Sequence, residues 1–266
     1  MNINEQIDRI KEEGYNEANA EAKLCQDIIL QMISKSTLSR NCTIKGGVVM
    51  RSISQDTRRA TQDMDIDFIR YSLEEDSIER FVSKLNEAGD VSIKIIGRIE
   101  ELKQQDYHGK RIHIEIEDET GTKLNSKIDL GVNKNMDIAQ EEYCFDIGFD
   151  DDGASLLINS KEQMLTEKLR SILKFGPFST RFKDIYDIYY LLDKVNEERL
   201  LQCFDTFIFA DYGMRENDIV DILKRVRTTF EDERYIERLE TSRKNWLGVS
   251  NETVMSGIIN GLKAMK

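Results

Sequence analysis

Proline is almost absent from this chain. Pro177 is the only proline among 266 residues, where average usage would give about thirteen. Long uninterrupted helices and strands are therefore expected, and a proline-rich linker between domains is excluded. Apolar residues make up 39% of the chain and charged residues 33%, which is typical of a soluble globular protein and not of a disordered one.

The few cysteines show no pairing pattern. They lie far apart, which excludes a zinc motif or a disulfide framework and is typical of reduced thiols in the cytoplasm. No apolar run approaches the ~18 residues that a membrane-spanning helix needs. The first residues have neither a basic start nor an apolar stretch, so we expect no signal peptide and no membrane partner. The cysteines are Cys25, Cys42, Cys144 and Cys203.

Positive charge is scarce in the first part of the chain. The whole chain has 38 basic and 50 acidic residues, for a net charge of −12. Residues 1–159 contain 20 basic and 32 acidic side chains, whereas residues 160–266 contain 18 of each. A protein that coats nucleic acid would be basic, so this class is excluded. A nucleic-acid partner would have to touch a local basic strip and a metal ion.

Hydrophobic periodicity predicts a mixed first part. A helical repeat covers residues 3–34 and is interrupted near Gly14. Alternating apolar and polar residues elsewhere predict strands, which would form a small mixed sheet. Further helices are predicted over 48–54 and 77–88, and strands over 42–44, 63–69, 91–99, 111–117 and 124–132.

The second part is predicted to be helical throughout. Beyond Ser160 the apolar pattern has the helical period, in five or six segments. The run 150–153 is acidic, poor in apolar residues and ends in glycine, which favours a domain boundary there. We therefore expect an α/β domain over residues 1–155 and a helical domain over residues 156–266. The predicted fold class is α+β, a mixed β-sheet with flanking helices followed by a C-terminal helical bundle.

The most informative segment is the predicted strand 63–69. Side chains on a strand alternate between its faces, so three carboxylates share one face and three apolar side chains the other. Neighbouring carboxylates on that face are about 6.6 Å apart along the chain. They repel each other unless a cation lies between them, and two of them can share a hard divalent ion such as Mg²⁺. The carboxylates are Asp63, Asp65 and Asp67, and the apolar residues are Met64, Ile66 and Phe68.

This segment has two other interpretations, a solvated strand edge and a calcium-binding loop. An isolated Asp-x-Asp strand is more often a solvated edge, where charge guards against aggregation. A calcium loop that starts at Asp63 would place Glu74 at its twelfth position. However, Phe68 occupies the sixth position, where such a loop needs glycine. The apolar alternation also favours a strand over a loop.

A glycine pair precedes this strand. Gly46 and Gly47 stand between a predicted strand and a predicted helix, where backbone N–H groups can approach a phosphate and the helix N-terminus favours its charge. A Gly-Gly pair alone is usually just a turn. Here residues 35–59 contain six basic side chains against Asp56 alone. A phosphate cradle followed by a carboxylate strand is the arrangement for metal-assisted nucleotidyl transfer.

With these motifs the sequence resembles the AbiEii-type (abortive-infection) toxins of type IV toxin–antitoxin systems, within the nucleotidyltransferase superfamily. Each motif is weak alone, but together they follow the family order across residues 45–188. The superfamily often has Gly-Ser where this chain has Gly-Gly, which the AbiEii branch commonly carries. The motifs are Lys45-Gly46-Gly47, Arg59-Ala60-Thr61-Gln62-Asp63-Met64-Asp65, Lys127-Ile128-Asp129, Glu167-Lys168-Leu169 and Arg181-Phe182-Lys183-Asp184-Ile185-Tyr186-Asp187-Ile188.

The resemblance assigns roles to these residues. The extra Asp67 leaves two possible metal-binding pairs, Asp63/Asp65 or Asp65/Asp67, and the distance from Arg59 and Thr61 favours the first. In such enzymes a third carboxylate, here Asp129, is a base or a further metal ligand. The implied metal ligands are Asp63, Asp65 and Asp129, the implied phosphate-binding residues are Lys45, Gly46, Gly47, Arg59 and Thr61, and the implied catalytic residues are Asp63, Asp65, Asp129, Lys168 and Asp184.

The residues themselves allow other interpretations of the later motifs. Asp129 alone could be a surface aspartate on a strand. Lys168 lies within the apolar arc of the predicted helix 161–174, where it either extends along the surface or directs its ammonium group at phosphates. For Lys183 and Asp187 we prefer an i,i+4 salt bridge. A basic strip in the helical part is the candidate for contact with an RNA backbone: Lys224, Arg225, Arg227, Arg234, Arg238, Arg243 and Lys244.

The predicted function follows from the resemblance. It implies a cytoplasmic, Mg²⁺-dependent nucleotidyltransferase, with Mn²⁺ as an alternative ion and a nucleoside triphosphate as substrate. It further implies a phage-defence toxin that adds nucleotides to RNA at the tRNA 3′ end, controlled by a separately encoded antitoxin that is a transcriptional regulator. The alternatives are nucleotidyl transfer to a small molecule or a protein hydroxyl, and a non-catalytic regulator that binds nucleotide or metal.

Overall fold

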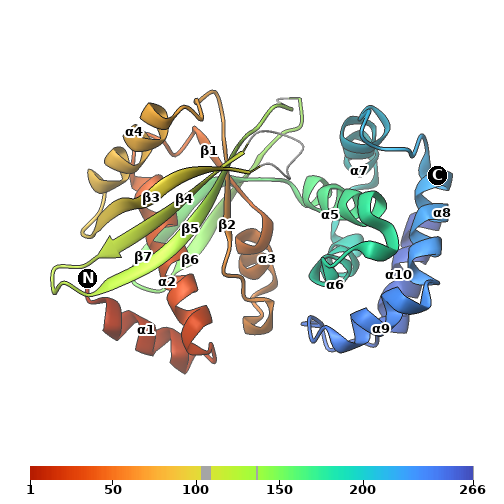
Figure 1. The fold of residues 1–266 in the computed structure, drawn as a ribbon, viewed down its shortest axis with the longest axis horizontal. Helices are drawn as coiled ribbons and strands as arrows, with labels where there is room; N and C mark the ends of the chain where they lie inside the picture. Colours follow the sequence, from red (N-terminus) through yellow and green to blue (C-terminus); the bar gives the residue numbers. More distant parts are fainter. Residues whose placement is uncertain (103–108, 136, 266) are drawn as a thin grey trace. The chain divides into compact units, whose positions relative to one another are not determined.

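The structure, a computed structural model, describes residues 1–102, 109–135 and 137–265. It divides into two compact units, Met1–Asn159 and Ser160–Lys266. The first is built on a mixed β-sheet and the second is helical (Figure 1). The α+β class predicted from the sequence is therefore confirmed. The division falls after residue 159, whereas the sequence analysis placed it after residue 155.

Within the described residues, seven strands form one sheet in the order β3-β4-β5-β2-β1-β7-β6. β1 pairs antiparallel with β2, whereas β2 pairs parallel with β5 and β1 parallel with β7. This order places β2, the aspartate strand, near the middle of the sheet. The strands are β1 Cys42–Lys45, β2 Met64–Phe68, β3 Ser92–Leu102, β4 Gly109–Glu117, β5 Lys123–Val132, β6 Glu141–Ile147 and β7 Asp150–Ile158.

The helix predicted over residues 3–34 is broken into two. Gly14 has a φ of +101°, a left-handed conformation that ends the first helix. The side chain of Asn16 then caps the second helix by accepting a hydrogen bond from the backbone N–H of Asn19. The helices of the first unit are α1 Ile3–Glu12, α2 Glu17–Lys35, α3 Gly46–Ser54 and α4 Glu75–Asn86, with a 3₁₀ turn at Thr57–Arg59.

The central strands have one apolar and one charged face. Ile44 of β1 lies opposite Ile66 of β2, and both are fully buried. The apolar side chains of the sheet pack against α2 and α4, with the rings of Phe68 and Phe81 5.1 Å apart between their centroids. Because side chains alternate along a strand, the aspartates of β2 lie on the opposite face.

β6 and β7 form a hairpin that the sequence analysis did not predict. The acidic residues 150–152 do not mark a boundary but begin β7. Gly153 has a φ of +65°, and a Cβ at this position would lie 2.6 Å from the carbonyl oxygen of Phe145 on β6. Beyond it Ala154 and Leu156 turn inward and are buried. The acidic start of the strand concealed this short apolar alternation.

The second unit consists of helices, as predicted. Its core includes the buried rings of Tyr186 and Tyr235. α5 ends at Gly176, whose φ is +52°, and Pro177 follows in a 3₁₀ turn at Gly176–Phe178. Two further short turns lie at Leu192–Lys194 and, with π-helical geometry, at Asp205–Phe209. The helices are α5 Lys161–Phe175, α6 Phe182–Leu191, α7 Glu197–Phe204, α8 Ile219–Phe230, α9 Glu233–Thr241 and α10 Asn251–Ala264.

Two arginines of the predicted basic strip donate hydrogen bonds within the second unit. Arg225 Nε donates a 3.2 Å hydrogen bond to the carbonyl oxygen of Leu173 at the end of α5. Arg238 donates to the carbonyl oxygen of Pro177. These two arginines therefore cap the carbonyl groups where α5 ends. Such contacts occupy N–H donors of these arginines, which are then not available to an RNA backbone.

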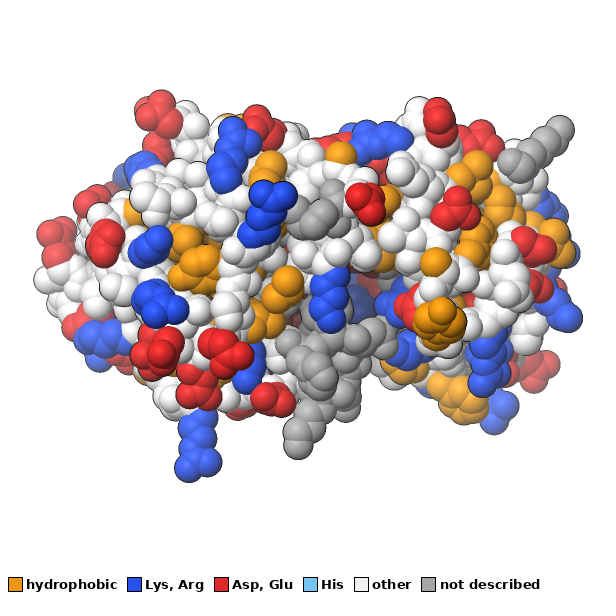
Figure 2. All heavy atoms as spheres, turned by 90° about the horizontal axis from the view of Figure 1, so that it is seen from above, with side chains coloured by type: hydrophobic (Ala, Val, Ile, Leu, Met, Phe, Trp, Pro, Cys, Tyr) orange, Lys and Arg blue, Asp and Glu red, His pale blue; other side chains and the backbone are white. Residues whose placement is uncertain are grey.

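The surface is not covered by charge of one sign. Acidic and basic side chains are interspersed over the face shown in Figure 2, with hydrophobic side chains between them. Among the described residues, no helix has both the length and the apolar character needed to cross a membrane.

Candidate active site

The glycine pair connects β1 directly to α3. Gly46 has a φ of +68°, and a Cβ there would collide with the Asp65 carboxylate. A Cβ on Gly47 would lie 2.5 Å from Thr61 Oγ1. Both positions therefore need glycine, one for its backbone conformation and both for the close approach of neighbours. Lys45, at the N-cap, makes no side-chain capping hydrogen bond, so the first N–H groups of α3 can receive an anion.

Strand register brings charged residues from five strands into one row. Asp65 of β2 lies opposite Lys45 of β1 on one side and Asp129 of β5 on the other. Asp129 in turn lies opposite Arg111 of β4, and Arg111 opposite Glu100 of β3. Residues in register share a face of the sheet, so these five side chains form what we call the charged row.

The carboxylates that flank Asp65 are each ion-paired. Asp63 lies 2.7 Å from Lys127 Nζ and Asp67 lies 2.8 Å from Lys45 Nζ. Asp129 accepts hydrogen bonds from Arg111 Nε at 2.7 Å and from a terminal guanidinium nitrogen at 2.8 Å. Asp65, between them, makes no ion pair with any described residue.

This environment makes the charge on Asp65 costly. Burial raises the pKa of its carboxyl from the ordinary 3.8 to about 6. Lys45 opposes that shift, whereas the carboxylates of Asp129, Asp63 and Asp67 add to it. A divalent cation next to Asp65 would offset this penalty, because it would supply the positively charged partner that Asp65 lacks among the described residues.

The carboxylates around Asp65 are ligands of the kind that a hard divalent ion prefers, but they are not already gathered into a metal-binding cluster. In the part of the chain that the structure describes, no three His, Cys, Asp or Glu side chains are gathered closely enough to hold a metal ion. The Lys127–Asp63 pair is exposed, whereas the Lys45–Asp67 pair is mostly buried. Exposed pairs are weak and open easily. Asp63 is therefore the neighbour that can join Asp65 in holding the ion.

The remaining predicted phosphate-binding residues lie close to the glycine pair or inside the fold. Thr61 packs against Gly47. Arg59 is buried at the end of the 3₁₀ turn, so its guanidinium is not an open surface group. Its predicted contact with phosphate stays a prediction. Arg111 was not among the predicted site residues. Its place in the strand 111–117 was predicted, but only strand register shows that it meets Asp129.

The predicted catalytic residues of the second unit form a buried network. Lys168 Nζ lies 3.1 Å from Asp184 Oδ1 and 2.8 Å from Asp187 Oδ2. Arg181 Nε lies 2.8 Å from the other oxygen of Asp184, and Trp246 Nε1 donates a 3.0 Å hydrogen bond to Asp187. Asp184, one of the predicted catalytic residues, therefore contacts the Lys168 ammonium group. Asp187, for which the sequence analysis preferred a salt bridge with Lys183, is fully buried and pairs with Lys168.

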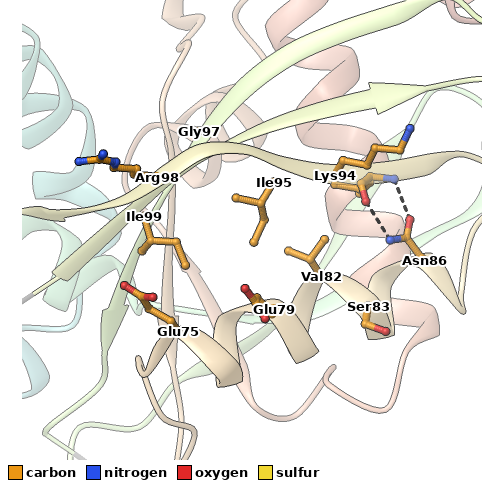
Figure 3. A pocket seen from close by; sticks show the side chains of 11 residues that line it. Glu75, Glu79, Val82, Ser83, Asn86, Lys94, Ile95, Gly97, Arg98 and Ile99 are labelled. Carbon is orange, nitrogen blue, oxygen red and sulfur yellow. Dashed lines mark hydrogen bonds between the residues drawn. The ribbon is translucent and has the colours of Figure 1, made fainter.

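A groove of about 760 Å³ lies elsewhere in the first unit. Figure 3 shows it between α4 and the edge strand β3, with Val82 and Ile95 inside and Glu79 and Lys94 at its margins. Asn86 of α4 closes one end through two hydrogen bonds to the backbone of Ile93. None of the predicted site residues lines this groove.

A mixed sheet with a glycine turn next to aspartates on adjacent strands is the arrangement expected of a nucleotidyltransferase. The family model described as "Nucleotidyl transferase AbiEii toxin, Type IV TA system" matches residues 28–249. The chain therefore belongs to the AbiEii nucleotidyl transferase toxin family, as the resemblance predicted. Membership implies a nucleoside triphosphate as substrate and a cognate antitoxin as partner.

Two solved structures are similar to this chain over 70% of its length. One is an antigenic nucleotidyltransferase-like protein from Paracoccidioides brasiliensis, with 16% identity, 86% of that chain covered and a TM-score of 0.44. The other is the antibiotic-resistance factor ANT(2'')-Ia, with 14% identity, 90% of that chain covered and a TM-score of 0.43. A comparison with curated proteins gives no match.

Proposed function

We propose that this nucleotidyltransferase adds nucleotides from a nucleoside triphosphate to an RNA acceptor, the 3′ end of tRNA. The observation that carries the proposal is the position of Asp65. It lies in register with Asp129 and in contact range of the glycine turn at Gly46. Carboxylates for a divalent ion and backbone donors for phosphate thus meet at one point, as nucleotidyl transfer requires.

Each residue of the first unit has a defined task in this proposal. Asp63 and Asp65 would hold Mg²⁺, which neutralises triphosphate charge and orients the reacting phosphate when bound. The N–H groups that open α3 at Gly46 and Gly47 donate hydrogen bonds to the phosphates. Asp129 accepts the proton of the acceptor hydroxyl. Arg111 uses one lone pair on each Asp129 oxygen and leaves the others free.

For Lys168, a residue of the second unit, the family motif implies a role of its own in this proposal. Lys168 neutralises negative charge as pyrophosphate leaves. Asp184, 3.1 Å from the ammonium nitrogen, orients it. The support for these two roles is the buried position of Lys168 within the family motif. A positive charge is kept inside a protein only where carboxylates or a ligand compensate it.

Transfer to RNA is tested directly with purified protein, Mg²⁺, labelled nucleoside triphosphates and total tRNA. We expect label in the tRNA fraction, lost when a chelator is added and lost in Asp65→Asn. Asp146→Asn is the matched control, because Asp146 is an exposed aspartate on β6 outside the charged row. Label transfer that persists in the double variant Asp63→Ala/Asp65→Ala would contradict the proposal.

One observation favours a second acceptor class. Residues 1–159 carry 32 acidic against 20 basic side chains, so most of the first unit repels RNA. A small-molecule or protein hydroxyl would not meet this repulsion. The same assay separates the two classes when tRNA is replaced by a total protein fraction or by a small-molecule extract, because the labelled product then changes.

The antitoxin partner is the remaining part of the proposal. We propose a separately encoded transcriptional regulator as the antitoxin, and the cytoplasm as the site of action, where nucleoside triphosphates and tRNA are found. A gene for a small winged-helix regulator next to the toxin gene would support this. Growth arrest on expression of the toxin that is not relieved by co-expression of that gene would contradict it.

A further inference from the structure

Gln26 of α2 lies behind the segment that carries Asp63. Its side chain is 1% exposed. Its amide nitrogen donates hydrogen bonds to two carbonyl oxygens, that of Thr61 at 3.0 Å and that of Asp63 at 3.4 Å. One amide group thus holds two backbone carbonyls that are two residues apart, directly before β2 begins at Met64.

The next residue of α2, Asp27, contacts the helix that follows the glycine pair. Asp27 is buried, and its carboxylate lies 3.0 Å from a guanidinium nitrogen of Arg51 on α3. α3 begins at the glycine pair. Two consecutive residues of α2 therefore connect to α3 and to the segment before β2, so this helix supports both parts of the site.

The backbone position of Asp63 is decided by these contacts. On one side, Thr61 packs so tightly against Gly47 that a Cβ there would lie 2.7 Å from Thr61 Cβ. On the other side Gln26 holds the carbonyl groups. The Asp63 side chain is 58% exposed and its ion pair with Lys127 is exposed too. Exposed pairs fix geometry poorly, so the backbone must place this carboxylate.

The amide oxygen of Gln26 gives a second, independent indication. It is buried and has no hydrogen-bond partner among the described residues. A buried acceptor without a partner destabilises a fold, and an apolar side chain of similar shape would avoid that cost. The presence of glutamine here is therefore explained by the two hydrogen bonds that its amide nitrogen donates to the backbone.

We infer that Gln26 is a positioning residue for the metal site, which acts by fixing the backbone of Thr61–Asp63 so that Asp63 can join Asp65 at a divalent ion. The inference deepens the proposed function and rests on its metal site, but not on the identity of the acceptor. Gln26 lies before residue 28, where the family match begins. Loss of a residue that orients a metal ligand typically lowers metal affinity or activity by about 10–100-fold.

The test uses the full chain and Mn²⁺ as the probe, with binding followed by electron paramagnetic resonance. Gln26→Met keeps the shape of the side chain and removes both donors. We expect it to weaken Mn²⁺ binding by about tenfold or more, and to lower the melting temperature, because the carbonyl oxygens of Thr61 and Asp63 lose their donor. Gln31→Met is the matched control on the same helix, because Gln31 bonds to Asp150 at the start of β7 instead.

The kinetic readout separates positioning from a merely structural role. For Gln26→Met we expect kcat to fall and to recover as the Mn²⁺ concentration is raised, with KM for the acceptor unchanged. Unchanged Mn²⁺ affinity in Gln26→Met, or an equal loss in Gln31→Met, would overturn the inference. If the wild type leaves tRNA unlabelled but Gln26→Met still binds Mn²⁺ more weakly than the wild type, the inference about Gln26 is upheld and only the proposed acceptor is wrong.

Discussion

Arg111 and Asp129 form a two-point contact across β4 and β5. Both Asp129 oxygens accept hydrogen bonds from the guanidinium group, at 2.7 and 2.8 Å. The hydrogen bond to Asp129 raises the pKa of Arg111, so the arginine keeps its charge at any pH of interest. The contact fixes the plane of the carboxylate that lies beside Asp65 in the charged row.

The first prediction concerns this contact. Arg111→Gln should lower nucleotidyl transfer by about 10–100-fold, because Asp129 loses the group that orients it. Arg111→Lys should recover only part of the activity, since an ammonium group cannot form the two-point contact. Initial rates at saturating triphosphate provide the measurement. Arg98→Gln, on an exposed arginine of β3, should keep full activity, and equal losses in Arg98→Gln and Arg111→Gln would refute the assigned role.

The second prediction concerns pH and Asp65. The pKa of Asp65 is raised from 3.8 to about 6 in the folded protein, so the folded state binds this proton more tightly than the unfolded chain. The contribution of Asp65 to the free energy of unfolding therefore falls as pH rises from about 4 to about 6, and is level above that. Asp65→Asn, which does not titrate, should be more stable than the wild type at pH 7 without metal.

Denaturant unfolding in a chelator, from pH 4 to pH 7.5, measures this effect. The stability difference between Asp65→Asn and the wild type should grow from pH 4 to about pH 6 and stay level above that. Added Mg²⁺ at pH 7 should stabilise the wild type and leave Asp65→Asn unchanged, because a ligand stabilises only the state that binds it. A stability difference that does not change with pH would show that burial does not raise the pKa of Asp65.

The third prediction concerns the glycine turn. Gly46→Ala places a Cβ against the Asp65 carboxylate and forces a left-handed backbone on alanine. It should destabilise the fold by about 1–3 kcal/mol and abolish transfer. Gly97→Ala imposes the same kind of backbone strain at a φ of +75°, with nothing within 4 Å of the new Cβ. It should lose stability but keep activity, and activity in Gly46→Ala would show that the turn does not serve the phosphates.

The fourth prediction concerns the buried network of the second unit. Lys168→Met leaves the buried carboxylate of Asp187 with the hydrogen bond from Trp246 but without its lysine. Removing one partner of a buried ion pair costs about 3–5 kcal/mol. Adding Asp187→Asn to this variant should restore part of the loss. Urea unfolding of the two single variants and the double variant gives the coupling energy, and strictly additive losses would exclude the pair as a unit.

Several features of the site could be predicted from local sequence. The alternation over residues 63–69 predicted β2 and placed Asp63 and Asp65 on one face, because a strand has a period of two residues whatever its partners. The glycine pair predicted the turn from β1 into α3. The helical period placed Lys168 within the apolar arc of its helix, since a helix carries its periodicity in its own sequence, but it did not decide where the ammonium group lies.

Other features could not be predicted in this way. The sequence favoured Asp63 over Asp67 as the partner of Asp65, but the mostly buried ion pair between Lys45 and Asp67 could be seen only in the structure. The pairing of Arg111 with Asp129 needs the register of β4 against β5. The β6–β7 hairpin was hidden by the acidic residues 150–152, which were interpreted as a boundary because they interrupt the apolar pattern.

By itself, the sequence determined the kinds of helix and strand, the order of the motifs and the family to which they point, because these properties are local or linear. Only the tertiary structure decided that β5 lies beside β2, that Asp129 therefore stands next to Asp65, and that Gln26 supports the backbone of Asp63. Sheet order and register arise from contacts between distant segments, and no local period encodes which strands will meet.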